Sequence, residues 1–118
     1  MQRITSEFFV SAYIRRRNMM GKFTAVVHRG ADEAGAIFIK VSRLDGTADL
    51  YGPIPQMFTE DLDPAIAGGR VFERLAVAAP EREVDERLFR ERGFDTDCWI
   101  VETECRDGTH DLDVLEIT

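Results

Sequence analysis

The sequence predicts an α+β fold, with a largely antiparallel sheet of five to six strands and two helices packed mainly on one face. Short segments rich in β-branched and aromatic residues follow one another between residues 23 and 51 without a helical pattern between them, which favours antiparallel pairing. Two Asp-Gly pairs, at 45–46 and 107–108, each stand between two such segments and predict two hairpins. Two longer segments, starting near residues 7 and 80, show the apolar spacing of helices.

The first predicted element is a helix from about Glu7 to Met20. Ser6 precedes it and is expected to cap its first turn, and Gly21 follows it as the stop signal. The apolar face of this helix consists of Val10, Tyr13 and Ile14. Residues 4–10 also alternate as a strand would, which leaves the start of the helix open.

Three strands are predicted next. The first covers Phe23 to His28 and ends in the loop-forming residues 29–35. The second and third, at 36–43 and 47–51, should form a hairpin with a two-residue turn at Asp45-Gly46. Residues 52–69 then form the longest irregular stretch, with one helical turn expected at 63–67. Loops of this length are more often functional or mobile than simple connectors.

The rest of the chain predicts a strand, a helix and a second hairpin. The strand covers residues 71–77, and Pro80 opens a helix that runs to about Arg92 and stops at Gly93. Segments 98–105 and 110–117 flank Asp107-Gly108 and predict the second hairpin.

Length and composition indicate one domain over residues 1–118, because a chain of 118 residues holds one core and is too short for two. The formal net charge of −7 argues against general nucleic-acid binding, which needs excess positive charge to neutralise phosphates. We see no apolar run of membrane-spanning length and no export signal. With Cys98 and Cys105 as its two cysteines, we expect a reduced, cytoplasmic protein.

Arg16 is the first candidate binding residue. It lies in the run Arg15–Arg17, whose side chains point about 100° apart on a helix and cannot all face one ligand. A solvated helix surface is therefore the expected role of this run. Together with Lys22 or Arg29, Arg16 could still frame a phosphate if the helix packs beside the strand at 23–28.

A second candidate group consists of His28, Arg29 and Asp32, which place an imidazole, a guanidinium and a carboxylate at the end of a predicted strand. A structural role explains the same residues, since Asp32 can organise the turn. Trp99, the single tryptophan, is either an interface anchor or a buried core ring. The sequence leaves both alternatives open.

No metal or cofactor is predicted. Cys105 and His110 fall opposite one another across the second predicted turn, but two ligands do not make a structural zinc site, which takes four. A nuclease of the restriction-enzyme type needs an acidic residue two positions before a lysine on its strand. Phe38 occupies that position before Lys40, so the sequence lacks the nuclease signature, although Asp32 could supply an acidic residue upstream.

Several segments together carry a resemblance to one protein family: Ser6–Ala12 with Arg15-Arg16, His28–Gly30 leading to Ala34–Ile37, Arg43–Ala48, and Phe94–Trp99. They resemble the uncharacterised bacterial domain-of-unknown-function family 1491, which is known mainly from alphaproteobacteria. The resemblance covers most of the chain apart from residues 53–69 and the last residues. It implies a short cytoplasmic protein and supplies no activity, ligand or catalytic residue.

Two functions are compatible with these observations. The first is a non-enzymatic binding or accessory module that recognises a protein partner or a small anionic ligand through the surface near Arg29 and the stretch at 52–69. The alternative is a small metal-dependent hydrolase or nuclease-like enzyme that uses carboxylates of the predicted strands and loops: Asp32, Asp49, Glu102 or Glu104. The lack of a complete catalytic pattern favours the first. A homodimer is compatible with either, because open sheet edges can pair with a second copy.

Overall fold

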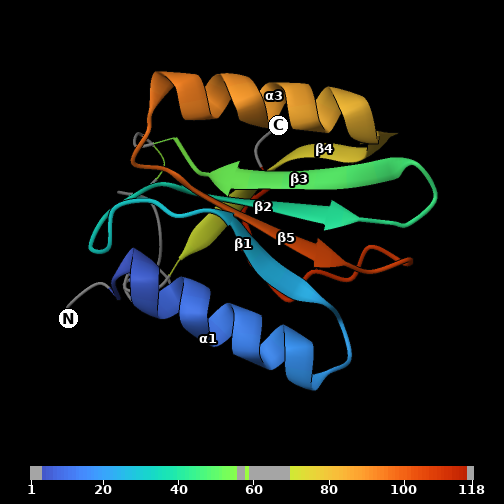
Figure 1. Ribbon diagram of the computed structural model, residues 1–118, viewed down its shortest axis with the longest axis horizontal. Coiled ribbons are helices and arrows are strands. Elements are labelled where there is room, and N and C mark those ends of the chain that lie inside the picture. Colours follow the sequence, from blue (N-terminus) through green and yellow to red (C-terminus); the bar gives the residue numbers. More distant parts are fainter. Residues whose placement is uncertain (1–3, 56–57, 59–69, 117–118) are drawn as a thin grey trace.

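The computed structural model describes residues 4–55, 58 and 70–116, which form a six-stranded sheet between two helices (Figure 1). The elements in chain order are α1 (Ser6–Met19), β1 (Thr24–His28), β2 (Ile37–Ser42), β3 (Thr47–Pro53), β4 (Val71–Pro80), α3 (Glu81–Phe94), β5 (Trp99–Glu104) and β6 (Asp113–Val114). The predicted α+β class is confirmed. Of the irregular stretch predicted at 52–69, residues 52–53 belong to β3, and residues 56–57 and 59–69, with the predicted helical turn, lie outside the described residues.

The sheet is mixed, with the strand order β1-β5-β2-β3-β4-β6. The pairs β1–β5, β2–β3 and β3–β4 are antiparallel, whereas β2–β5 and β4–β6 are parallel. The second hairpin predicted around Asp107-Gly108 is therefore wrong. After α3 the chain returns to the interior of the sheet, where β5 has a neighbour on each side and no free edge for the segment that follows it. That segment crosses instead to β4 and forms β6 there.

The two helices cover opposite faces of the sheet, not mainly one face as predicted (Figure 1). Val10 and Tyr13 of α1 belong to the core on one face, and Val84 and Leu88 of α3 pack with Phe38 on the other. All six residues of β2 are buried. Its long apolar run fits this position, because a strand covered on both faces needs no polar side. Within the described residues, no helix is both long and apolar enough to cross a membrane.

The cap of α1 is Thr5 rather than the predicted Ser6. The Thr5 hydroxyl accepts the N–H of Phe8 at 3.1 Å. Ser6 is buried, and its hydroxyl donates to the Gly35 carbonyl at 2.6 Å. The N–H groups of Ser6 and Glu7 donate to carbonyls of residues 33 and 32 at 3.1 and 2.9 Å. The loop between β1 and β2 therefore closes the N-terminus of the helix, although it lies far from it in sequence.

The β2–β3 hairpin is confirmed, but its turn is one residue longer than predicted. The N–H of Arg43 donates to the Thr47 carbonyl at 3.0 Å, so that residues 44–46 form the turn. Leu44 and Gly46 both have positive φ angles, 62° and 90°. The Asp45 carboxylate accepts the Thr47 N–H at 2.9 Å and fixes the second half of the turn.

Candidate functional site

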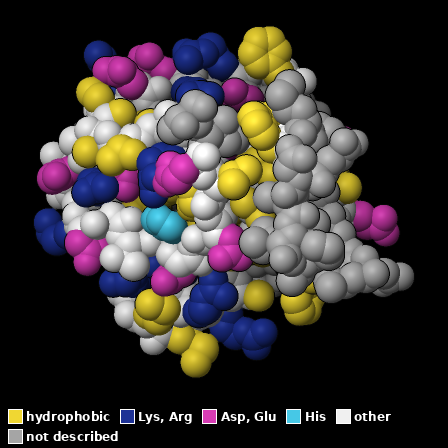
Figure 2. Space-filling model, turned by 180° about the vertical axis from the view of Figure 1, so that it is seen from behind, with side chains coloured by type: hydrophobic (Ala, Val, Ile, Leu, Met, Phe, Trp, Pro, Cys, Tyr) yellow, Lys and Arg dark blue, Asp and Glu magenta, His cyan; other side chains and the backbone are white. Residues whose placement is uncertain are grey.

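A hollow of about 510 Å³ lies where β3 and β4 meet the segment between β5 and β6, and we refer to it as the β3–β4 pocket. Side chains from separate parts of the chain converge on it, which is typical of ligand sites. Its lining consists of Arg43, Tyr51, Arg74, Val77, Asp107, Gly108, Thr109, His110 and Asp111. Figure 2 shows one face of the molecule, on which acidic, basic and histidine side chains are intermixed.

Asp49 is the buried charge behind the wall of this pocket. Its side chain is 1% exposed and accepts two hydrogen bonds from Arg43, from Nε at 3.0 Å and from Nη2 at 2.9 Å. The N–H of Ala78 donates a third at 2.6 Å. Three donors, two of them charged, compensate the carboxylate for its lost water. Hydrogen bonding to Asp49 also raises the pKa of Arg43, so this guanidinium is a fixed positive charge.

A bulge in β4 aims the Ala78 N–H at Asp49. Opposite Asp49, β4 contains two residues, 77–78, where regular pairing would have one. Ala78 has a φ angle of 47°, a left-handed conformation that costs an L-residue about 1–2 kcal/mol. Strained residues of this kind gather at functional sites. The strain is maintained here by the hydrogen bond to a buried carboxylate.

The last turn of α1 holds the far wall of the pocket through a buried arginine. Arg17 is 0% exposed and donates to the Asp111 carboxylate and to the Thr109 carbonyl, both at 2.8 Å. Its Nε donates to the Thr103 hydroxyl at 3.1 Å. The predicted solvated surface is therefore wrong for Arg17, because the rotation between successive helix residues turns this side chain toward the sheet while its neighbours face water.

Arg16, the first binding candidate of the sequence, lies behind the segment that lines the pocket and is not part of its lining. Its guanidinium donates to the Asp111 carbonyl at 3.2 Å. Arg29 lies near the other end of α1, where it contacts Glu7. The two arginines therefore do not frame one anion.

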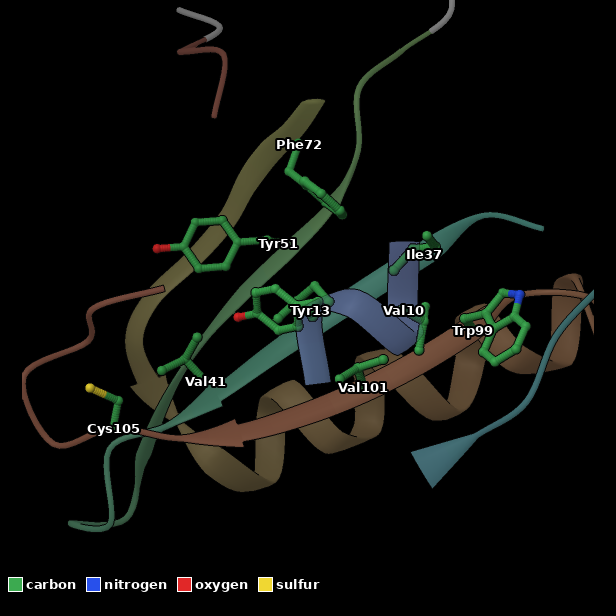
Figure 3. Packing of buried hydrophobic residues seen from close by; sticks show 10 residues of the cluster. Val10, Tyr13, Ile37, Val41, Tyr51, Phe72, Trp99, Val101 and Cys105 are labelled. Atoms are coloured by element: carbon green, nitrogen blue, oxygen red, sulfur yellow. The ribbon is translucent and has the colours of Figure 1, made fainter. Parts of the chain in front are cut away.

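Tyr13 and Tyr51 both point their hydroxyls toward the segment that follows Cys105 (Figure 3). Tyr13 donates to the His110 carbonyl at 2.8 Å, and the rings of Tyr51 and His110 lie 4.7 Å apart between centroids. His110 accepts the Leu112 N–H on Nδ1 at 3.0 Å, which requires that nitrogen to be unprotonated. Burial, and then the charge of a nearby arginine, lowers the pKa of His110 below its ordinary 6.5. The imidazole is therefore neutral at pH 7.

The predicted pairing of Cys105 with His110 across a hairpin is wrong. The thiol of Cys105 donates to the Asp107 carboxylate at 2.9 Å. The backbone and hydroxyl of Thr109 donate to the same oxygen at 2.9 and 2.7 Å. These hydrogen bonds lower the pKa of Asp107 below its usual range, and the bond from Cys105 has the largest effect. Asp107 thus organises the turn that lines the pocket.

Arg74 supplies the second cationic wall. Its guanidinium lies 5.6 Å from the centroid of the Tyr51 ring, and it forms an ion pair with Glu116. Hydrogen bonds to Tyr51 and to Glu116 raise the pKa of Arg74 above its usual range. A third of its side chain, 33%, remains exposed. Arg74 is therefore charged, held in place and accessible from the pocket.

The other candidate residues of the sequence come together at the start of α1, where each already has a partner. Arg29 pairs with Glu7 at 2.7 Å and with Asp32 at 2.8 Å, and its guanidinium lies 4.9 Å from the centroid of the Trp99 ring. Hydrogen bonding to Glu7 is the main cause that raises the pKa of Arg29. His28 places Nδ1 2.8 Å from the carbonyl that precedes Trp99. These contacts join a helix to a loop and leave no unbalanced positive charge.

Trp99 is a core residue, and the loop beside it packs closely against the backbone that leads into β5. The ring is 1% exposed, and Nε1 donates to the Ala31 carbonyl at 2.7 Å. A Cβ atom added at Gly30 or Gly35 would lie 2.2 or 2.4 Å from the Asp97 carbonyl. The two glycines therefore let the backbone of this loop lie directly against the chain that leads into β5.

The carboxylates considered for a metal-dependent enzyme do not converge on one point. Three of the four pair with a cation in a different part of the fold: Asp32 with Arg29, Asp49 with Arg43, and Glu102 with Lys40. In the part of the chain that the structure describes, no group of three or more His, Cys, Asp or Glu side chains is arranged to hold a metal ion.

The sequence analysis missed Arg43 and Arg74 as site residues, and it named Asp49 only as one of four carboxylates of the alternative, metal-dependent enzyme. Arg43 and Asp49 lie diagonally on one face of the β2–β3 hairpin, because Val41 pairs with Asp49 and Arg43 with Thr47. The predicted two-residue turn would have put the two side chains on opposite faces, so its register did not reveal their contact. Arg74 had no local signal either, because its place beside the pocket depends on the crossing from β5 to β6. Gly108 was recognised as a turn glycine, and its bare Cα also makes room for Arg43, since an added Cβ would lie 2.5 Å from Nη2.

Comparisons with known proteins match this chain to one family and to solved structures from it. The family described as "Protein of unknown function (DUF1491)" matches residues 4–113. A solution structure of protein Atu0922 from A. tumefaciens is 40% identical, with a TM-score of 0.79 over 99% of this chain and 98% of that chain. A crystal structure of a DUF1491 family protein from Caulobacter crescentus CB15 is 30% identical, with a TM-score of 0.74 over 95% of this chain and 97% of that chain. No curated protein matches.

Proposed function

The chain belongs to the DUF1491 family, and we propose that it is a non-enzymatic binding module that holds a small anionic ligand in the β3–β4 pocket. The observation that carries the proposal is the convergence of two arginines, Arg43 and Arg74, on one hollow that also presents the side chains of Tyr51 and Thr109. Guanidinium groups bind carboxylates and phosphates through paired hydrogen bonds. Arg29, the anchor expected from the sequence, already holds two carboxylates and is a weaker candidate.

The pocket arginines are ordered before a ligand arrives. Arg43 is held by both oxygens of Asp49, and Arg74 is held by the Tyr51 ring and by Glu116. Their side chains nevertheless remain 24% and 33% exposed. Groups that are already fixed lose little conformational entropy on binding, which improves affinity.

The same contacts argue against catalysis by the two best candidates for a general base. Asp49 accepts three hydrogen bonds, and His110 uses Nδ1 to accept a backbone N–H. A general base needs a lone pair directed at the proton that it removes. Binding is therefore the function that this geometry supports best.

An NMR titration of isotope-labelled protein with inorganic phosphate and with butyrate, at constant ionic strength, tests the proposal. We expect saturable shifts of the amide signals of residues 43, 74 and 107–111. Arg74→Gln should weaken binding about tenfold, because a charged hydrogen bond to the anion is lost. Arg29→Gln is the matched control, since it also removes one partly exposed, ion-paired arginine, and it should change the affinity less than about twofold.

Shifts centred on residues 28–32 would place the site at the start of α1 and refute the proposal. Equal weakening by Arg74→Gln and Arg29→Gln would do the same, because it would indicate a general effect of charge. A linear response to both anions, without saturation, would show only screening by salt.

A further inference from the structure

Arg74 already holds a carboxylate of this chain. Glu116, on the segment after β6, pairs with its Nη1 atom, and the Glu116 side chain is 64% exposed. The backbone of this segment is attached separately, because the Leu115 N–H donates to the Phe72 carbonyl at 2.8 Å. Rotation of one exposed side chain is therefore sufficient to take the Glu116 carboxylate off Arg74 while the backbone stays in place.

Arg74 keeps its support when Glu116 leaves. The Tyr51 ring beneath its guanidinium is 2% exposed and belongs to the core on the α1 face of the sheet. Packing fixes this ring independently of Glu116. The guanidinium would therefore remain at the pocket wall with an unoccupied edge for another anion.

The charges around the pocket balance without Glu116. Among the described residues, the charged side chains that line it or form an ion pair with its lining are then Arg17, Arg43 and Arg74 against Asp49, Asp107 and Asp111. Glu116 adds one negative charge to this set. An anion that bound beside Glu116 would therefore meet a net negative pocket, whereas an anion that replaced Glu116 would not.

We infer that the ligand of the β3–β4 pocket is a carboxylate, and that it binds Arg74 in exchange for Glu116; this inference rests on the proposed function. A ligand carboxylate carries one negative charge, as Glu116 does, so the exchange leaves the net charge around the pocket unchanged. A phosphate dianion would bring a second negative charge to a pocket that is otherwise balanced. Glu116 acts as an internal competitor, and the apparent affinity is lowered by the fraction of molecules in which it occupies Arg74.

The test is the affinity of Glu116→Gln for butyrate, whose chain ends like a glutamate side chain, measured by the same NMR titration. We expect binding about two- to fivefold tighter than in the parent protein, the range that an exposed ion pair allows. Glu73→Gln is the matched control. Glu73 is next to Arg74 on β4, carries the same charge, and forms no ion pair with another described residue, so its loss should change the affinity much less.

Three outcomes would overturn the exchange. If the parent protein, Glu116→Gln and Glu73→Gln all bind butyrate with the same affinity, Glu116 does not compete with the ligand. The proposed function is then supported without the exchange. If phosphate saturates the pocket and butyrate does not, the ligand class is wrong. If neither the parent nor Glu116→Gln binds either anion, the proposed function fails together with the exchange.

Discussion

Replacing Lys40 with methionine tests how the sheet is joined to α3. Lys40 is 4% exposed, in the middle of β2, and faces α3. Its ammonium group contacts the carboxylates of Glu81 and Asp85 at 2.7 Å each and that of Glu102 at 3.3 Å. Methionine has a similar length and no charge, so it fills most of the space and leaves three carboxylates without their shared cation.

The expected cost is about 2 kcal/mol of unfolding free energy at pH 7. Removing one partner of a fully buried ion pair costs about 3–5 kcal/mol. Here the carboxylate side chains of Glu81, Asp85 and Glu102 are 33%, 56% and 34% exposed, so water compensates part of the loss. Burial of the methionine side chain offsets a further part.

The dependence on pH distinguishes this mechanism from a simple packing defect. Burial alone would lower the pKa of Lys40, but hydrogen bonds to Asp85 and Glu81 outweigh it and raise the pKa above its ordinary value of 10.5. The folded state therefore holds this proton more tightly than the unfolded state does. The stabilisation is complete below pH 10.5 and is lost as the pH rises through the raised pKa.

Urea denaturation followed by circular dichroism, from neutral to alkaline pH, measures both effects. The gap between Lys40→Met and the parent should be widest below pH 10.5 and should narrow in strong alkali, as Lys40 loses its proton. Lys22→Met, at a half-buried lysine that forms no ion pair with another described residue, is the matched control and should stay within about 0.5 kcal/mol of the parent. A gap that is constant across pH, or absent at pH 7, would refute the electrostatic explanation.

Other parts of the fold give three further predictions. Gly30→Ala should destabilise by about 2 kcal/mol or more in thermal unfolding, because its Cβ would lie 2.2 Å from a backbone carbonyl, whereas Gly93→Ala, with open space around it, should not. Arg17→Met should cost about 3 kcal/mol and the exposed Arg15→Met less than about 0.5 in urea denaturation. Because the folded state lowers the pKa of His110, stability should fall as the pH drops through 6.5, and His110→Gln should lack this component.

The local signals of the sequence predicted individual elements well. The glycine at position 21 marks the end of α1, where its φ angle is 80°. The Asp45-Gly46 pair marks a hairpin, because turn chemistry and two adjacent apolar segments agree. Asp107-Gly108 has the same chemistry and lies in a turn, yet no hairpin forms there. A turn signal states that the chain changes direction, and it does not state which strand the next segment will join.

The site depended on contacts that no local pattern encodes. The three partners of the Arg17 guanidinium lie 86, 92 and 94 residues away in the sequence. Within the run Arg15–Arg17, helical spacing places only position 17 on the face of Val10 and Tyr13, but it does not identify the partners that this arginine finds there. The Ala78 N–H reaches Asp49 only because a bulge places it there, and an alanine is an unusual residue for a left-handed conformation. Each of these contacts is set by the order of the strands.

We place the proposed ligand site on the sheet and not on the arginine-rich helix because of what α1 does. Its first turn pairs Glu7 with Arg29, and its last turn pairs Arg17 with Asp111. Each end of the helix thus forms an ion pair with a loop, one before β2 and the other after β5. A charge that is already neutralised attracts an anion weakly. Arg74 differs from both arginines. Arg17 is fully buried and Arg29 holds two carboxylates, whereas Arg74 is one-third exposed and its ion pair is with one carboxylate, that of Glu116, for which we propose that an anion is exchanged. Exchangeable pairing, more than the number of arginines, is therefore the reason for which we propose a ligand site at Arg74.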